Sequence, residues 1–188
     1  MTAVATRRSL RDRFKALFNK PTPMVASAPT PIRTPEGWQL IQCEDTESFV
    51  KWLGHDEKGL PFKEGELPSL GSHLLIEMFD CEPESIKFES GVADAMLTAA
   101  RASEATIVAD SFHEFKPWGV SGAVVIQESH YTIHTWPEFG YAAVDLFYCG
   151  GTISVHNAVE LLEKRFKPGR MKFLVVRRGM QDEVQERG

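Results

Sequence analysis

Apolar residues along the chain recur at two different spacings, and these predict an alternation of strands and helices. Short apolar or β-branched runs of the length typical of strands occupy residues 73–78, 106–109, 119–127, 131–136, 141–148 and 171–176. Two longer segments, residues 92–102 and 154–166, carry apolar residues at helical spacing. The second begins at Ser154, a residue type favoured at helix N-termini, and Pro168 and Gly169 follow its end.

The order of these elements predicts the fold class. A strand and a helix come first, several consecutive strands follow, and a helix and a strand come last. Consecutive strands with short connections pair in antiparallel fashion, and a sheet buries one of its faces against helices. We therefore expect an α/β protein, a two-layer sandwich in which a mainly antiparallel sheet carries helices on one face.

The first third of the chain lacks this pattern. Residues 20–35 contain five prolines with small residues between them, a composition typical of an extended linker. Residues 37–67 contain scattered aromatic side chains, too few for a core of their own. The expected organisation is a basic, proline-rich, disordered tail over residues 1–36, an extension packing on the core over 37–67, a functional domain over 68–180 and a tail over 181–188.

Composition narrows the class of protein. With 188 residues, 43% of them hydrophobic, and a net charge of -5, the chain reads as one globular domain with no sign of a nucleic-acid partner. Its three cysteines form no CxxC pair, so neither a zinc site nor a disulfide framework is indicated, and a reducing cytoplasm fits. No apolar run approaches the roughly 20 residues that span a bilayer, and the N-terminus lacks the apolar stretch of a secretory signal.

The richest chemistry surrounds the bond between Glu128 and Ser129, which follows an apolar strand. A serine hydroxyl can attack the carbonyl that precedes it when the backbone is strained and a nearby group stabilises the oxyanion. The product is an ester, and elimination from that ester breaks the chain. The sequence therefore contains a candidate self-cleavage site.

Five segments resemble one family in order and spacing. They are GSHLLIE at 71–77, ATIV at 105–108, FHEFKPWGVSG at 112–122, ESHYTIHTWPE at 128–138 and GYAAVDLFYCG at 140–150. On these segments the chain resembles the prokaryotic S-adenosylmethionine decarboxylase proenzymes, pyruvoyl-dependent enzymes of spermidine synthesis, over about residues 71–179. The resemblance implies cleavage between Glu128 and Ser129 and a covalent pyruvoyl group derived from Ser129, with no external cofactor.

The resemblance also implies roles for particular side chains. His134 would remove a proton during the elimination, Ser121 would hydrogen bond to the intermediate, and Cys149 would protonate the carbon that has lost carbon dioxide. S-adenosylmethionine would form a Schiff base with the pyruvoyl ketone. Three residues match positions that surround this substrate: Phe115 at the adenine, Glu138 at the ribose and Trp136 at the pocket wall. A homodimer of cleaved protomers is implied as well.

Strand periodicity limits which of these groups can meet. Residues 130, 132, 134 and 136 share one face of a strand and residue 129 lies on the other, so a bend near Glu128 is required to bring His134 beside Ser129. Four strand residues separate His130 from His134 by about 13 Å, which argues against a metal site between them.

Two other functions stay open. The same pyruvoyl chemistry acts on ornithine or arginine in related enzymes, and Ser72 and Trp118 depart from the residues typical of S-adenosylmethionine decarboxylases. The presence of Phe115, Trp136 and Glu138 together favours the nucleoside substrate. A non-catalytic homologue that activates a partner decarboxylase is the third possibility, and retention of Ser129 and Cys149 argues against it.

Overall fold

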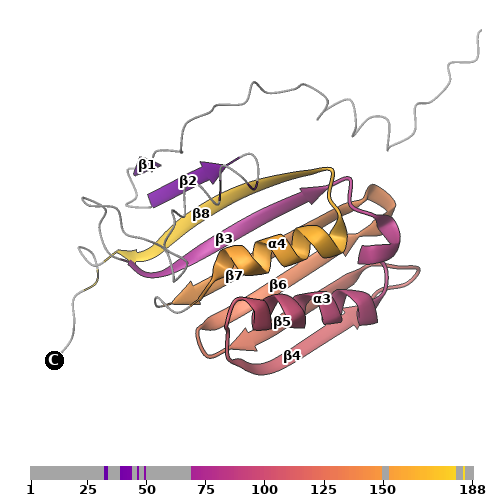
Figure 1. Ribbon diagram of the computed structural model, residues 1–188, viewed down its shortest axis with the longest axis horizontal. Helices are drawn as coiled ribbons and strands as arrows, with labels where there is room; N and C mark the ends of the chain where they lie inside the picture. The colour runs from indigo at the N-terminus through magenta and orange to yellow at the C-terminus, as the bar shows by residue number, and fades with distance from the viewer. Residues whose placement is uncertain are drawn as a thin grey trace, which may run out of the picture.

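The computed structural model describes residues 69–149 and 153–180, two short strands at 32–33 and 39–43, and the single residues Thr46, Phe49 and Val184. The predictions for the rest of residues 1–67, including the basic tail, fall outside these residues. The described part forms two layers, a twisted sheet and a pair of helices packed against it (Figure 1).

The sheet has eight strands among the described residues. In spatial order they are β1 (Ile32–Arg33), β2 (Gln39–Cys43), β8 (Arg170–Met180), β3 (Ser69–Phe79), β7 (Tyr141–Cys149), β6 (Ser129–Trp136), β5 (Val120–Ile126) and β4 (Ile107–Glu114). Every neighbouring pair is antiparallel. The first strand after residue 67, β3, therefore lies in the middle, between the last strand β8 and β7.

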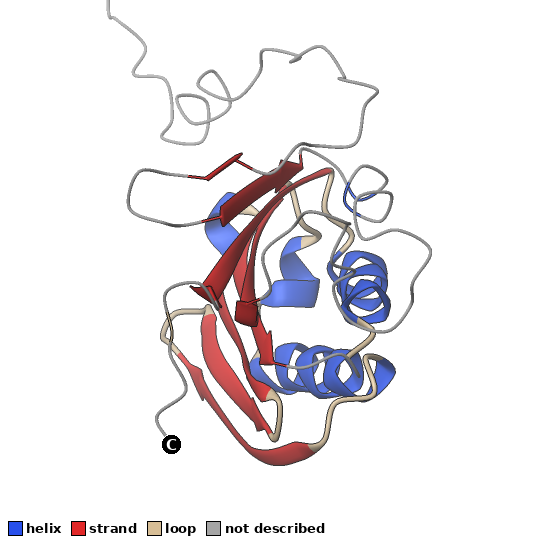
Figure 2. Cartoon of the chain, turned by 90° about the vertical axis from the view of Figure 1, so that its left-hand side faces the viewer, coloured by secondary structure: helices blue, strands red, loops and turns tan. Residues whose placement is uncertain are grey.

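Two helices cover one face of this sheet. They are α3 (Glu89–Ala102) and α4 (Val155–Phe166), which pack side by side and are accompanied by the short 3-10 helices η1 (Pro83–Ile86) and η2 (Pro137–Phe139) (Figure 2). Each helix buries an apolar stripe, in α4 the predicted residues Val155, Ala158, Val159, Leu162 and Phe166. The predicted two-layer α/β sandwich is confirmed.

Both ends of α4 depend on backbone geometry. Ser154 occupies the predicted N-cap position, but its side chain makes no capping hydrogen bond there, and its carbonyl accepts from the N–H of Asn157 at 3.1 Å. At the other end Lys167 adopts a left-handed conformation with φ of 48° and donates its N–H to the carbonyl of Glu163. This conformation turns the chain out of the helix before Pro168.

Burial alternates along the strands, so the sheet has two distinct faces. In β7, Ala142, Val144, Leu146 and Tyr148 are buried against the helices, and the residues between them are half-buried or exposed. The second face carries His73, His134, Asp145 and Cys149, and no described helix covers it. We call it the open face.

Several strands are longer than their apolar runs. β4 continues past the predicted 106–109 to Glu114 because its outer half is an exposed edge strand, where polar residues are tolerated and no apolar pattern arises. At the opposite edge β2 pairs with β8, and Phe49 stacks on Phe173 of β8 with ring centroids 4.7 Å apart. β1 lies within the segment expected to be irregular and pairs with β2 over two residues.

Candidate active site

The Glu128–Ser129 bond lies at the tight turn that joins β5 to β6. Ile126 pairs with Ser129, so Gln127 and Glu128 form a two-residue connection. Ser129 has a φ of 145°, a backbone region populated almost only by glycine. Holding a serine there costs on the order of 1–3 kcal/mol. The strained backbone that the cleavage chemistry calls for is present at the predicted bond.

Hydrogen bonds with Thr106, the residue before β4, and with Cys149 of β7 hold this turn. The N–H of Gln127 donates to the carbonyl of Thr106 at 2.9 Å, and the N–H of Thr106 donates to the Glu128 carboxylate at 3.1 Å. The N–H of Cys149 donates to the main-chain carbonyl of Glu128 at 2.8 Å. This carbonyl oxygen is the one on which negative charge would develop during attack by Ser129, so Cys149 supplies an oxyanion donor through its backbone.

Cys149 also presents its side chain beside the turn. It is the last residue of β7, it is exposed, and it pairs with Gly71 of β3. Tyr148 pairs with Ser129, which places the end of β7 alongside the start of β6. We call this group of Glu128, Ser129 and Cys149 the cleavage end of the sheet.

Ser121 and His134 form a second cluster on the open face. They are direct partners in the β5–β6 pairing, and Ser121 Oγ lies 2.7 Å from His134 Nδ1. The ring of Trp136 lies 6.3 Å from that of His134, and its other side meets Tyr141 at 5.4 Å. The hydroxyl and the imidazole are therefore coupled to each other and flanked by an aromatic ring.

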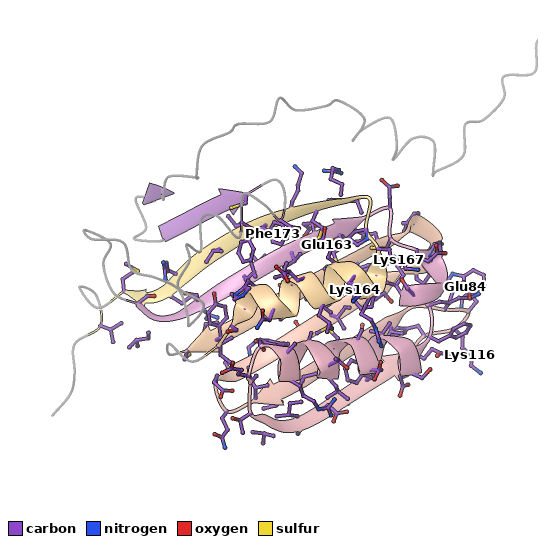
Figure 3. All side chains as sticks on the ribbon, in the orientation of Figure 1. Glu84, Lys116, Glu163, Lys164, Lys167 and Phe173 are labelled. Carbon is purple, nitrogen blue, oxygen red and sulfur yellow. The ribbon has the colours of Figure 1, made fainter. Side chains whose placement is uncertain are left out.

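The three residues expected to bind substrate gather at one end of the sheet, where β4 and β6 end and β5 and β7 begin. Trp136 closes β6 and is 39% exposed, Glu138 lies in η2, and Phe115 is 49% exposed in the loop after β4. Lys116 of this loop is labelled in Figure 3 and marks this end. Exposed aromatic rings and a carboxylate are groups that can bind a nucleoside. We call Phe115, Trp136 and Glu138 the recognition end.

The structure does not bring the two ends together within one chain. β6 pairs without interruption with β5 from Ser129 to His134 and with β7 from Ser129 to Trp136, so the side chain of His134 lies about 17 Å along the strand from Ser129. Trp136 lies about 24 Å along it. The distortion at Ser129 is local, and the predicted bend does not shorten the strand.

One neighbour of Ser129 escaped the sequence analysis. His130 Nδ1 lies 3.3 Å from Ser129 Oγ, within hydrogen-bonding distance. The only sequence signal was adjacency, and neighbouring residues of a regular strand point to opposite faces. Thr106 and Cys149 donate hydrogen bonds through their backbone N–H groups. Side-chain patterns do not reveal such bonds, so the sequence could not indicate them.

Residues fit for a metal ion are not gathered anywhere in the described part of the chain. No group of three or more histidine, cysteine, aspartate or glutamate side chains there is arranged to hold one. Within the same residues no helix is long and apolar enough to cross a membrane. The groups at the cleavage end are a strained serine, a hydrogen-bonded carbonyl, the imidazole of His130 and a thiol.

Fold and site together define a class of protein: a two-layer α/β sandwich with a strained serine at the turn between two neighbouring strands. A family described as S-adenosylmethionine decarboxylase matches residues 72–179, more than half of the chain, and the chain belongs to this family. The S-adenosylmethionine decarboxylase proenzyme of Thermotoga maritima is 48% identical over 118 residues, 63% of this chain and 91% of the relative. That of Acidithiobacillus ferrooxidans is 45% identical over 114 residues, 61% and 86% of the two chains.

A solved structure agrees with the fold. The adenosylmethionine decarboxylase from Aquifex aeolicus superposes with a TM-score of 0.58 at 28% sequence identity, covering 64% of this chain and 97% of that one. The predicted family membership and its enzymatic nature are confirmed. The matched region leaves out the first 71 residues.

Proposed function

We propose that the protein is made as a proenzyme, cuts itself between Glu128 and Ser129, and decarboxylates S-adenosylmethionine with a pyruvoyl group left at residue 129. The observation that carries this proposal is the pairing of strain and polarisation at one bond. Ser129 has a φ of 145°, and the carbonyl before it accepts a hydrogen bond from Cys149. Cleavage relieves the strain, and the N–H donor stabilises the charge that forms on the way.

In the first reaction Ser129 Oγ attacks the carbonyl carbon of Glu128 and replaces the peptide bond with an ester. Loss of the Ser129 α-proton then expels the Glu128 carboxylate, leaving dehydroalanine, and water converts that residue to the pyruvoyl group with release of ammonia. His134 is assigned the α-proton, and Ser121, hydrogen bonded to it at 2.7 Å, assists at the intermediate.

In the second reaction the pyruvoyl group supplies a ketone that condenses with the substrate amine and withdraws electrons as carbon dioxide leaves. Cys149 is assigned the proton that the substrate carbon then needs, because its thiol is exposed beside residue 129. Phe115 stacks on the adenine, Glu138 accepts hydrogen bonds from the ribose hydroxyls, and Trp136 forms a wall of the substrate pocket. The product is decarboxylated S-adenosylmethionine, the aminopropyl donor for spermidine.

A homodimer is part of the proposal, because one chain cannot complete the site. Along β6, Ser129 of the cleavage end lies about 17 Å from His134 and about 24 Å from Trp136 of the recognition end, farther than either side chain can reach. The cleavage end and the recognition end both lie at the open face, which no described helix covers. Two copies packed through their open faces, with strands running in opposite senses, would lay the recognition end of one over the cleavage end of the other.

The remaining expectations stay predictions. Residues 1–36 as a tail, 37–67 as an extension on the core, 68–180 as the catalytic domain and 181–188 as a tail are supported by the match to residues 72–179. Cytoplasmic localisation is supported by the sequence, whose three cysteines form no CxxC pair and no disulfide framework. The absence of a nucleic-acid partner rests on the net charge of -5.

Intact mass under denaturing conditions, together with carbon dioxide release, tests the proposal. We expect two chains divided between Glu128 and Ser129, the second blocked at its N-terminus, and release from S-adenosylmethionine rather than from ornithine or arginine. The Ser129→Ala variant should stay a single inactive chain. A single inactive chain from the parental sequence would instead indicate a non-catalytic homologue, and turnover of ornithine or arginine would change the substrate.

A further inference from the structure

The first step of self-cleavage needs a base on the Ser129 hydroxyl, and the residues assigned so far do not provide one. His134 is committed to the later α-proton and lies about 17 Å away along its own strand. His130 Nδ1 lies 3.3 Å from Ser129 Oγ. We propose that His130 is the catalytic base of the acyl shift, a role that rests on the proposed function and adds a residue to it.

The contact exists because the backbone at Ser129 is irregular. Adjacent side chains of a regular strand point to opposite faces, so a serine and the histidine after it do not normally meet. The φ of 145° at Ser129 breaks this alternation at one residue, while β6 continues regularly beyond it. The strained conformation therefore both exposes the bond to attack and brings the attacking hydroxyl to an imidazole.

Two rings fix the orientation of His130 on the open face. Phe147, its direct partner on β7, lies 5.5 Å away between ring centroids, and His73 of β3 meets it edge-on at 6.3 Å. These contacts limit rotation of the imidazole about its side-chain bonds. A base held within hydrogen-bond reach of its proton satisfies the geometric requirement for general base catalysis.

One charged and one neutral side chain neighbour His130 on the open face. Asp145 is its diagonal neighbour across β6 and β7, about 7–8 Å away, and accepts a hydrogen bond from Thr132 at 3.1 Å. Burial, the largest cause, lowers the pKa of His73, which keeps this neighbouring ring neutral near neutral pH. The guanidinium of Arg178 lies over the ring of Phe147, 4.7 Å from its centroid.

The step balances within the chain. The proton of Ser129 Oγ passes to His130 Nδ1 as the Oγ–C bond to Glu128 forms, and the Cys149 N–H stabilises the oxyanion. Collapse breaks the bond between the Glu128 carbonyl carbon and the Ser129 nitrogen, and the imidazolium returns its proton to that nitrogen. The result is an ester and a free amine at residue 129, with His130 neutral again.

The test follows cleavage of His130→Asn by pulse labelling in cell-free translation, because asparagine keeps a hydrogen-bonding group but is no base. We expect cleavage to slow by about 100-fold or more. His156→Asn, which removes a histidine of α4 on the helical layer, is the matched control and should cleave at the parental rate. Circular dichroism and the melting temperature establish that each variant folds.

Hydroxylamine identifies the blocked step, since it cleaves esters and leaves peptide bonds intact. Uncleaved His130→Asn should resist it, whereas His134→Ala, blocked after the shift, should be cut at residue 128. A folded His130→Asn that cleaves at the parental rate, or that accumulates a hydroxylamine-sensitive ester, overturns the role of His130. A parental chain that never cleaves overturns the proposed function itself.

A second variant, His130→Ala, tests the same role independently of whether His130→Asn folds. His130→Ala should regain cleavage in added imidazole but not in pyrazole, which has a similar size and is a far weaker base. Rescue by both compounds, or by neither, counts against a base at this position.

Discussion

Gly71 of β3 and Cys149 of β7 approach so closely that a side chain at position 71 would collide with the Cys149 thiol. A Cβ added to Gly71 would be 2.9 Å from Cys149 Sγ and 3.0 Å from Cε2 of Phe147. The two residues are direct partners on β3 and β7, so the close approach follows from the pairing itself. The missing side chain of Gly71 leaves the space in which the thiol of the proposed proton donor sits.

We expect Gly71→Ala to cleave but to turn over about 10-fold to 100-fold more slowly, because a displacement of the order of 1 Å at a reacting group has an effect of this size. Carbon dioxide release per cleaved chain measures it. The matched control is Gly91→Ala in α3, where the nearest atom to an added Cβ is 4.0 Å away and turnover should not change. Parental turnover of Gly71→Ala would show that the thiol position is not critical.

Cys149→Ser should retain at least partial cleavage and lose decarboxylation by about 100-fold to 10,000-fold. The backbone N–H that meets the Glu128 carbonyl survives the substitution, whereas the serine hydroxyl is a far weaker acid than the thiol. Misplaced protonation should convert the pyruvoyl group to alanine, which a mass time course of the second chain detects. A cleaved variant with parental turnover and no alanine rules out Cys149 as the proton donor.

Complementation between two inactive chains tests the shared site. Ser129→Ala lacks the nucleophile and His134→Ala lacks the base for elimination, so neither should cleave alone. After the two are refolded together, the His134→Ala chain should be cleaved, because its Ser129 receives His134 from the partner. Distinct tags identify which chain is cut. The absence of cleavage in a dimer shown to be mixed would place both residues in one protomer.

Reactivity toward a thiol reagent should distinguish the exposed Cys149 from the buried Cys43 and Cys81. Burial, followed by the nearby Asp80, raises the pKa of Cys81 to about 12, so this thiol is protonated throughout pH 7–9, where only the thiolate reacts. Cys43 is buried too, and Cys149 is exposed. Iodoacetamide should therefore label the folded Ser129→Ala proenzyme at Cys149 alone and label all three cysteines in urea, as peptide mass mapping will show. Labelling of folded Cys81 would contradict the burial.

The sequence by itself determined the helices and strands and indicated the candidate cleavage site. The helical stripe from Val155 to Phe166 and the alternation along 141–148 each repeat over enough residues to specify an element, and both elements form as predicted. The Glu128–Ser129 bond and Cys149 lie within segments whose resemblance indicated the family, which the match to residues 72–179 confirms. In the outer half of β4, polar residues occupy an exposed edge strand. The apolar pattern is lost there, so the sequence did not predict where this strand ends.

Only the tertiary structure decided which of these groups meet. The N–H of Cys149 reaches the carbonyl of Glu128, and Gly71 faces Cys149, because antiparallel registers bring together strands that lie far apart in sequence. The separation of His134 from Ser129 follows from unbroken pairing of β6 on both sides, a property of three strands rather than one. The strand registers are set by packing of the whole sheet against α3 and α4. The backbone hydrogen bonds that follow from them do not depend on side-chain identity, so the order of residues in the sequence does not reveal them.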